Sequence, residues 1–180
     1  MCVIGRTDDD KISRQEIVAC FDAKTGAKRW EHRFNVYHTT VPYNRVGWAS
    51  LAADPETGTI YAHGVAGQLI AFDRDGEIRW EHFTAETLGR LSGYGGRTQT
   101  PVVDGDLLLI AFVTAGWGDQ APPRQRVFAF DKRTGEVVWV ATPGGFPKDM
   151  NTQSTPVVAT IAGRRTVVNG NADGTIYGLD

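Results

Sequence analysis

The chain has 180 residues and a mass of 19.7 kDa, the size of a single domain or slightly more. Its residues are 41% hydrophobic and 22% charged, a composition that is typical of a folded globular protein and excludes a disordered one. The 19 Lys and Arg residues are balanced by 21 Asp and Glu residues, which argues against a nucleic-acid-binding surface, and the longest uncharged apolar stretch, 107–115, is too short to span a membrane as a helix.

The N-terminal segment combines a short apolar run with charges. Residues 1–5 are apolar, but Arg6 and the acidic run 8–10 follow at once, so the segment lacks the apolar length of a secretion signal. We interpret residues 2–6 as a β-strand. The acidic run is interpreted as a solvated loop, because it lacks the further spaced ligands and the glycine turn of a calcium-binding loop.

An internal repeat runs through the whole chain. Four apolar segments each end in an aspartate, and these aspartates are 51, 58 and 49 residues apart. In the first three copies a glycine follows three or four residues later, and a tryptophan lies four residues after that glycine. The aspartates are Asp22, Asp73, Asp131 and Asp180, the glycines Gly26, Gly76 and Gly135, and the tryptophans Trp30, Trp80 and Trp139. The match indicates one repeated structural unit.

Each complete copy has the chemistry of a β-hairpin. The apolar run before the aspartate is typical of a strand, the aspartate side chain accepts hydrogen bonds from N–H groups of the turn, and the glycine adopts the positive φ of a tight reversal. The tryptophan then lies on the outgoing strand, where its large ring is expected to cover a neighbouring sheet.

A second pair of strands precedes each of the last three hairpins. The predicted strands are 48–53 with 59–63, 100–103 with 107–113, and 155–160 with 166–169. Four short strands in a repeat of about 50 residues are the pattern of a β-propeller blade. The sequence therefore predicts an all-β fold of four-stranded antiparallel blades that pack face to face.

The repeat resembles the PQQ-like (pyrroloquinoline quinone-type) β-propeller family, which includes the BamB-like proteins and the quinoprotein alcohol dehydrogenases. The ending 131–135 followed by Trp139 matches the family's hallmark with its docking tryptophan. WD40 repeats are disfavoured, because they are about 40–45 residues long and carry a Trp-Asp pair that this sequence lacks. A small residue lies two positions before each aspartate, namely Cys20, Ala71, Ala129 or Gly178.

The register of the repeat predicts a single partial propeller over 1–180. Its blades are expected at 1–34, 47–83, 98–140 and 153–180, with the first lacking its innermost strand and the last its outermost strand. Closed propellers hold about 4–8 blades, and an open arc leaves apolar faces uncovered. We therefore expect the missing blades of the same propeller to lie in a longer polypeptide, with closure by a second copy as the alternative.

The long loops are expected to gather on one face of the propeller. They are 35–47, 84–97 and 141–153 between blades, and 7–14 and 114–125 within blades. Long loops often carry function, and Arg, Trp and Tyr are enriched in binding hot spots. The candidate ligand- or partner-binding residues on this face are Arg45, Trp48, Tyr94, Arg97, Trp117, Asn151 and Gln153. Roles in core packing or loop stabilisation are the alternative for each of them.

The histidines and cysteines form no catalytic or metal-binding pattern in the sequence. His32 and His82 share one repeat position, two residues after a tryptophan, which indicates a repeated role in the strand. Cys2 is expected nearly opposite Ala19 or Cys20 on the adjoining strand. A bridge is conceivable there, but we expect free thiols.

Two functions compete. The sequence shows no Ser/His/Asp arrangement, phosphate loop or zinc-spaced cluster, which favours a non-catalytic scaffold or binding module without an evident cofactor. The resemblance also admits part of a quinoprotein dehydrogenase that holds PQQ and a calcium ion, although such enzymes carry an adjacent cysteine pair and this chain does not. Both branches are usually exported, so the resemblance implies a periplasmic or cell-surface location. The protein or small-molecule partner is not identified.

Overall fold

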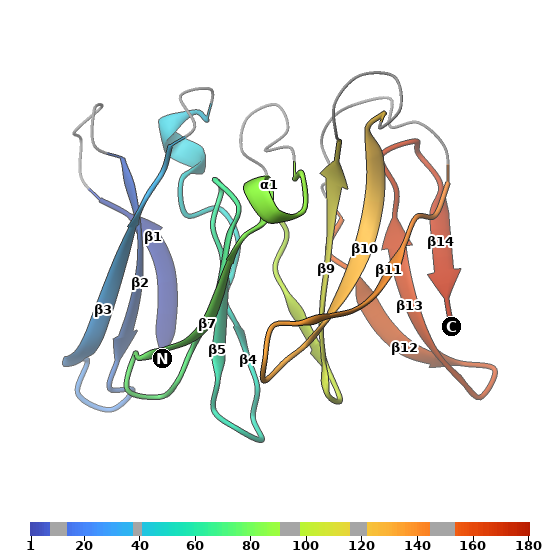
Figure 1. The fold of residues 1–180 in the computed structure, drawn as a ribbon. Coiled ribbons are helices and arrows are strands. Elements are labelled where there is room, and N and C mark those ends of the chain that lie inside the picture. The colour runs from blue at the N-terminus through green and yellow to red at the C-terminus, as the bar shows by residue number, and fades with distance from the viewer. Residues whose placement is uncertain (8–13, 38–40, 91–97, 116–121, 145–153) are drawn as a thin grey trace.

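The computed structural model describes residues 1–7, 14–37, 41–90, 98–115, 122–144 and 154–180. In these residues the strands form four antiparallel sheets, and each strand pairs with its neighbour in the sequence. The sheets stand side by side in chain order (Figure 1). The predicted all-β fold of small antiparallel sheets is confirmed.

The sheets contain three or four strands each. Sheet 1 contains β1 (Cys2–Arg6), β2 (Gln15–Phe21) and β3 (Lys28–Asn35). Sheet 2 contains β4 (Ala52–Ala53), β5 (Ile60–His63), β6 (Gln68–Phe72) and β7 (Ile78–Phe83). Sheet 3 contains β8 (Val102–Asp104), β9 (Leu107–Thr114), β10 (Arg124–Asp131) and β11 (Val137–Ala141). Sheet 4 contains β12 (Val157–Ile161), β13 (Arg164–Gly170) and β14 (Ile176–Leu179).

Two ends of the molecule differ in the elements they carry. The short helices η1 (Tyr43–Arg45) and α1 (Thr84–Thr87), which the sequence did not predict, lie at the upper end in Figure 1. We call this end the long-loop face. The hairpin turns that follow β2, β6 and β10 lie at the opposite end, the hairpin face.

The innermost strands β4, β8 and β12 begin later in the sequence than predicted, and the residues that precede them hydrogen-bond to one another. The N–H of Ser50 donates to the Thr100 hydroxyl at 3.1 Å, and the N–H of Thr100 donates to the Thr155 hydroxyl at 3.4 Å. The segment that precedes β4 is therefore hydrogen-bonded to the segment that precedes β8, and that segment is hydrogen-bonded to the one that precedes β12.

The repeated aspartates form the predicted turns. Asp22 Oδ1 accepts from the N–H groups of Lys24 and Thr25 at 2.9 and 3.0 Å. Asp131 Oδ1 accepts from the equivalent N–H groups of its own turn, Arg133 and Thr134, at 2.8 and 2.9 Å. The turn glycines Gly26, Gly76 and Gly135 have φ of 72°, 91° and 76°. In the Asp131 turn, these backbone N–H groups hold the pKa of the carboxyl below its ordinary value.

The small repeat position is explained by its cross-strand partner. Cys20, Ala71 and Ala129 lie directly opposite Trp30, Trp80 and Trp139, and in each pair of strands a bulge follows at the next residue. A large side chain beside the indole would crowd this site. The bulge was not predicted, because no residue of the repeat marks it.

The tryptophans join each sheet to the next. The indole N–H of Trp30 donates to the carbonyl of Arg74 at 2.9 Å, and that of Trp80 donates to the carbonyl of Lys132 at 3.1 Å. Each ring lies over the turn glycine of the following sheet: a Cβ added at Gly135 would lie 2.7 Å from the ring of Trp80. The predicted covering role of these two tryptophans is confirmed.

The apolar core is divided among the junctions between sheets. One cluster fills the junction of sheets 1 and 2, a second that of sheets 2 and 3, and a third that of sheets 3 and 4. His32 and His82 pack alike at successive junctions, with their rings 5.2 Å from Phe72 and 5.6 Å from Phe130. Face-to-face packing of sheets therefore holds the described parts of the chain together.

Cys2 and Cys20 form a disulfide, so the expectation of free thiols was wrong. The two residues are direct partners in the register of β1 and β2. Met1 and Phe21, one position further, exchange both backbone hydrogen bonds at 2.8 Å, so Cys2 and Cys20 occupy a non-hydrogen-bonded pair. Side chains are closest at such pairs, which brings the two sulfurs within bonding reach.

Breaking this disulfide should lower the free energy of unfolding. The bridge closes a loop between residues 18 apart, for which chain entropy predicts about 3 kcal/mol. We expect Cys2→Ser with Cys20→Ala to show this loss in urea unfolding, and dithiothreitol to cause it in the unsubstituted chain. If dithiothreitol also lowers the free energy of unfolding of the doubly substituted chain, the Cys2–Cys20 disulfide is not the source of the loss.

Candidate functional site

Two of the predicted binding residues lie on the long-loop face. Arg45 is the last residue of η1, and Trp48 follows on the segment that leads to β4. The indole of Trp48 is 55% exposed, so it does not cover the core of the inner strands. The remaining candidates lie outside the described residues: Tyr94, Arg97, Trp117, Asn151 and Gln153.

Arg45 and Trp48 form one of two cation–π pairs that include residues of the segment 43–48. The guanidinium carbon of Arg45 lies 5.9 Å from the centre of the Trp48 ring, and that of Arg6 lies 4.0 Å from the centre of the Tyr43 ring. Arg6 also donates to the Tyr43 carbonyl at 3.2 Å. Sequence analysis missed Arg6 and Tyr43, because β1 and η1 are joined only in three dimensions. We call these four residues the Arg–aromatic patch.

The segment that carries the patch is fixed to sheets 1 and 2 by buried Glu16. One carboxylate oxygen accepts from the N–H of Gly47 and the other from the N–H of Val65, each at 2.9 Å. Gly47, with φ of 74°, also approaches Gly5 so closely that an added Cβ would lie 2.7 Å from its backbone. Glu16 therefore joins three segments, of which one is the loop beneath the patch.

Gln125 takes the same repeat position in sheet 3 as Glu16 in sheet 1, six residues before the aspartate. Its amide donates to the Gly170 carbonyl at 3.0 Å and accepts from the N–H of Ala172, both in the turn between β13 and β14. In sheet 2 the position is a glycine, Gly67. Sequence analysis missed Glu16, and this column of the repeat, with Glu16 and Gln125 in equivalent positions, is the signal that could have identified it.

Two further buried groups, Arg90 and His63, lie near Glu16, and their surroundings determine how readily each carries a charge. Arg90 donates to the Val65 carbonyl at 3.1 Å and interacts electrostatically with Glu16. Burial, and secondarily the charge of Arg90, hold the pKa of His63 well below its ordinary value. His63 is therefore neutral at pH 7, with Nδ1 donating to the Gln99 carbonyl at 3.2 Å. The cluster orders the backbone of the turn 64–67.

Glu16 should make stability pH-dependent. Burial raises its pKa from 4.5 to about 7, although Gly47, Val65 and Arg90 act in the opposite direction. A carboxyl with a raised folded-state pKa stabilises the fold below its unfolded pKa, and this stabilisation is lost as the pH rises from about 4.5 to about 7. We expect a loss of about 3 kcal/mol over that window. His63, whose pKa is lowered, acts in the opposite direction in both chains, so the loss is measured as a difference: between pH 5 and pH 8, the free energy of unfolding in urea should fall further in the unsubstituted chain than in Glu16→Gln. The same change with pH in both chains would contradict it.

A second buried charge cluster lies on the hairpin face between sheets 2 and 3. The ammonium of Lys132 pairs with Asp54 at 2.9 Å and with Glu56 at 2.8 Å. The Lys132 carbonyl accepts from Tyr61 and from the indole of Trp80. A cavity of about 550 Å³ adjoins this cluster and is bordered by β4 and β8. Lys132, Asp54 and Glu56 already pair with one another, so this charge cluster joins sheets 2 and 3.

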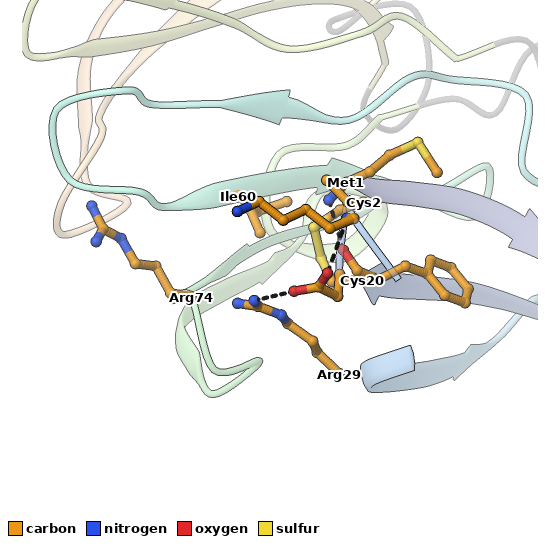
Figure 2. A pocket seen from close by; sticks show the side chains of 10 residues that line it. Met1, Cys2, Cys20, Arg29, Ile60 and Arg74 are labelled. Atoms are coloured by element: carbon orange, nitrogen blue, oxygen red, sulfur yellow. Dashed lines mark hydrogen bonds and ion pairs between the residues drawn. A yellow bond between two sulfur atoms is a disulfide. The ribbon is translucent and has the colours of Figure 1, made fainter. Parts of the chain in front are cut away.

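A cavity of about 530 Å³ adjoins the disulfide at the junction of sheets 1 and 2. Figure 2 shows the side chains that line it, with the Cys2–Cys20 bridge close to Ile60. Arg29, at its rim, pairs with Asp22 at 2.6 Å. This pairing lowers the pKa of Asp22 and joins the guanidinium of Arg29 to its carboxylate.

Within the described ranges, no three His, Cys, Asp or Glu residues are placed to hold a metal ion. Cys2 and Cys20 form a bridge between two strands and are not the adjacent cysteine pair that the quinoprotein alternative expects. No helix in the part of the chain that the structure describes is long and apolar enough to cross a membrane. The Arg–aromatic patch contains the two candidate residues, Arg45 and Trp48, that lie within the described ranges.

Solved structures with similar folds are about twice as long as this chain. BamB from Moraxella catarrhalis is 20% identical with a TM-score of 0.58, and the match covers 100% of this chain and 49% of that one. A europium-containing methanol dehydrogenase is 16% identical with a TM-score of 0.52, covering 98% and 48%. Sqt1 from Saccharomyces cerevisiae is 12% identical with a TM-score of 0.59, covering 99% and 45%. At these identities the likeness shows the fold alone.

Sequence comparison identifies the family. No curated protein sequence matched the chain. A family model described as outer membrane protein assembly factor BamB matches residues 14–180, which include all four copies of the repeat. The predicted PQQ-like resemblance is confirmed, and the described sheets form about three and a half blades. The chain belongs to the BamB family of PQQ-like β-propeller repeat proteins.

Proposed function

We propose that this chain is a non-catalytic scaffold or binding module whose partner surface is the long-loop face. The observation that carries the proposal is the Arg–aromatic patch. It combines Arg45, Tyr43 and Trp48 of one short segment with Arg6 of β1, and Trp48 is more than half exposed. Tryptophan, tyrosine and arginine are the residues that contribute most at protein interfaces.

The support beneath the patch favours binding without a large rearrangement. Glu16 fixes Gly47 from below, and Arg14 donates to the carbonyl of Val41 at the start of the same segment. A surface that is ordered before the partner arrives loses less conformational entropy on association. Peptides and proteins with acidic side chains beside aromatic ones match the charge and the ring surfaces of the patch.

We further propose that the remaining blades belong to a longer polypeptide and that the protein is exported. The chain spans about half the length of the solved propellers that it matches. The disulfide supports a location outside the cytoplasm, since such bridges persist mainly in oxidising compartments. Both proposals agree with membership of a family described by an outer-membrane assembly factor.

Peptide selection tests the binding face. Peptides from a random displayed library are selected on the unsubstituted chain, and their affinities are then measured for Trp48→Ala and Arg45→Ala. We expect each substitution to weaken binding at least tenfold. Ile78→Ala, at a partly exposed apolar residue of β7, is the matched control and should leave binding unchanged. Selected peptides that are insensitive to both patch substitutions would contradict the proposal.

Thermal unfolding with and without the cofactor tests the dehydrogenase alternative. Adding PQQ with Ca²⁺ must raise the melting temperature if the folded chain binds them tightly. The scaffold proposal expects no rise, and a rise that saturates with PQQ concentration would contradict it.

A further inference from the structure

The turn between β13 and β14, at the upper end in Figure 1, carries a row of oxygen-bearing side chains that its equivalent in sheet 2 lacks. Asn169, Asn171 and Asp173 alternate along the chain, and Gly174 follows them. Counted back from the aspartate of the repeat, the three equivalent positions in sheet 2 are Ala62, Gly64 and Ala66. The oxygen-bearing side chains are therefore not a fixed part of the repeat.

The backbone of the turn forms without these side chains. In sheet 4 the N–H of Gly174 donates to the Asn171 carbonyl at 3.0 Å, and in sheet 2 the N–H of Gly67 donates to the Gly64 carbonyl at the same distance. Both glycines have a positive φ, 91° and 100°. The same reversal is therefore built in sheet 2 with no side-chain oxygen at these positions, so hairpin formation alone does not account for the row in sheet 4.

The row lies at the junction of sheets 3 and 4. Asn169 pairs with Tyr177 in the register of β13 and β14. Side chains alternate along strands, so Asn169 shares its face of the sheet with Val167 and Leu179, which pack against sheet 3. The amide of Asn169 is therefore directed into the junction, and Asn169 is only 2% exposed.

Two buried amide oxygens of the row are left without a hydrogen bond. Asn169 Nδ2 donates to the Gly170 carbonyl at 3.0 Å, and Asn171 Nδ2 donates to the Pro143 carbonyl at 3.2 Å. The Oδ1 atoms of both asparagines are buried and have no hydrogen-bond partner among the described residues. Burying an unpaired carbonyl oxygen is costly, so each such oxygen needs an explanation. A bound cation satisfies both.

The Asn171 amide and the Asp173 carboxylate converge on the segment that leaves β11. A Cβ added at Gly144 would lie 2.5 Å from Asn171 Nδ2 and 2.7 Å from Asp173 Oδ2. Rotating the amide by half a turn exchanges Nδ2 with Oδ1 and brings the oxygen to the same place, beside the Pro143 carbonyl. A carboxylate, an amide and a backbone carbonyl therefore meet where sheets 3 and 4 are joined.

These donors have the chemistry that calcium prefers. Ca²⁺ binds carboxylate, amide and backbone carbonyl oxygens and completes its shell with water. The order Asn-x-Asn-x-Asp-Gly over 169–174 follows the first half of the calcium-loop pattern D-x-[DN]-x-[DN]-G, with asparagine in place of the first aspartate. The twelfth residue of that pattern, Asp180, lies beyond the end of β14 and takes no part.

We propose that the turn between β13 and β14 is a calcium site, in which Ca²⁺ is bound by side-chain oxygens of Asn169, Asn171 and Asp173 and by the Pro143 carbonyl. The ion joins sheet 4 to the segment that leaves sheet 3. With a single carboxylate the site is weak, with a Kd of about 1 mM, because calcium affinity depends on the number of charged ligands. The site is separate from the Arg–aromatic patch and needs no PQQ.

Thermal unfolding in millimolar CaCl₂ tests the site. We expect calcium to raise the melting temperature by about 2 to 4 °C over NaCl of equal ionic strength, since binding to the folded chain stabilises it. Asp173→Asn should remove this rise, while its amide oxygen can still accept from the N–H of Thr175 as the carboxylate does at 2.9 Å. Asp75→Asn, at an exposed turn residue of sheet 2, is the matched control and should keep the rise.

A gain of affinity provides a second test that does not depend on a weakened chain. Asn171→Asp adds a carboxylate to the site, so it should lower the Kd for CaCl₂ in isothermal titration calorimetry at least tenfold. Both measurements are made without PQQ. The chain with Ca²⁺ alone is accordingly the baseline for the PQQ titration, in which only a further rise with PQQ concentration supports the dehydrogenase alternative.

Three results would overturn the calcium site. The first is an unsubstituted chain whose melting temperature is the same in CaCl₂ and in NaCl. The second is a calcium-dependent rise that Asp173→Asn leaves intact, because the ion is then bound elsewhere. The third is Asn171→Asp with an unchanged calcium affinity. None of these measurements involves peptide binding at the long-loop face, so failure of the calcium site and failure of the proposed function are distinguishable.

Discussion

Replacing Lys132 with methionine should lower the free energy of unfolding by about 3 to 5 kcal/mol, because it leaves a buried carboxylate without its partner. Lys132 and Asp54 are each only 2% exposed, and the ammonium lies 2.9 Å from the Asp54 carboxylate. Burial alone raises the pKa of Asp54, but the hydrogen bonds from Lys132, Thr57 and the Glu56 N–H outweigh it and hold that pKa below its ordinary value. Urea unfolding at pH 7 measures the loss.

The pH dependence and a surface pair provide the controls. Without the ammonium, the pKa of Asp54 rises, so the deficit of Lys132→Met should shrink as the pH falls and the carboxyl is protonated. Arg133 pairs with Asp106 one residue further along, but the two side chains are 53% and 71% exposed. Arg133→Met should therefore cost less than about 1 kcal/mol. Equal losses for the two substitutions would show that Lys132 is not buried in an ion pair.

Gly135→Ala should destabilise the chain by roughly 2 to 5 kcal/mol. The left-handed backbone conformation costs an L-residue about 1 to 2 kcal/mol, and overpacking of a closed core costs about 1 to 3 kcal/mol more. At Gly135, φ is 76° and the added methyl group would lie 2.7 Å from the Trp80 ring, which is itself buried. Thermal unfolding of the variant measures the sum of both effects.

Gly26→Ala is the matched control. Gly26 occupies the same turn position with φ of 72°, but no atom lies within 4 Å of its added Cβ. Only the conformational cost remains, so the expected loss is about 1 to 2 kcal/mol. If both substitutions destabilise equally, the indole of Trp80 does not rest on the Gly135 turn and the junction of sheets 2 and 3 is wrongly described.

The local parts of the fold could be predicted from the sequence. Asp22, Gly26 and their equivalents determine the hairpins through contacts within a few residues, so their spacing was sufficient evidence. The position of Trp30 on the outgoing strand followed from the same spacing. The predicted inner strands began too early, because the Ser50 and Thr100 segments bond across to neighbouring sheets, and such contacts leave no periodic signal.

The candidate site was only partly predictable. Arg45 and Trp48 were identified by residue type and loop length, and both lie on the long-loop face. Arg6 and Tyr43 were missed, since their pairing depends on how β1 meets η1. The Cys2–Cys20 bridge was wrongly rejected, although the two cysteines were expected on adjoining strands. The prediction left Ala19 or Cys20 open as the residue opposite Cys2, and the sequence does not indicate the redox compartment.

Hydrogen exchange of the tryptophan indoles, resolved by nuclear magnetic resonance and assigned with Trp→Phe variants, tests the stacking of sheets most directly. The structure predicts slow exchange for Trp80, whose N–H donates to the Lys132 carbonyl in a buried junction, and slowed exchange for Trp30. Trp48, which is more than half exposed, should exchange rapidly. Rapid exchange of Trp30 and Trp80 at the rate of Trp48 would contradict the radial stacking of the sheets.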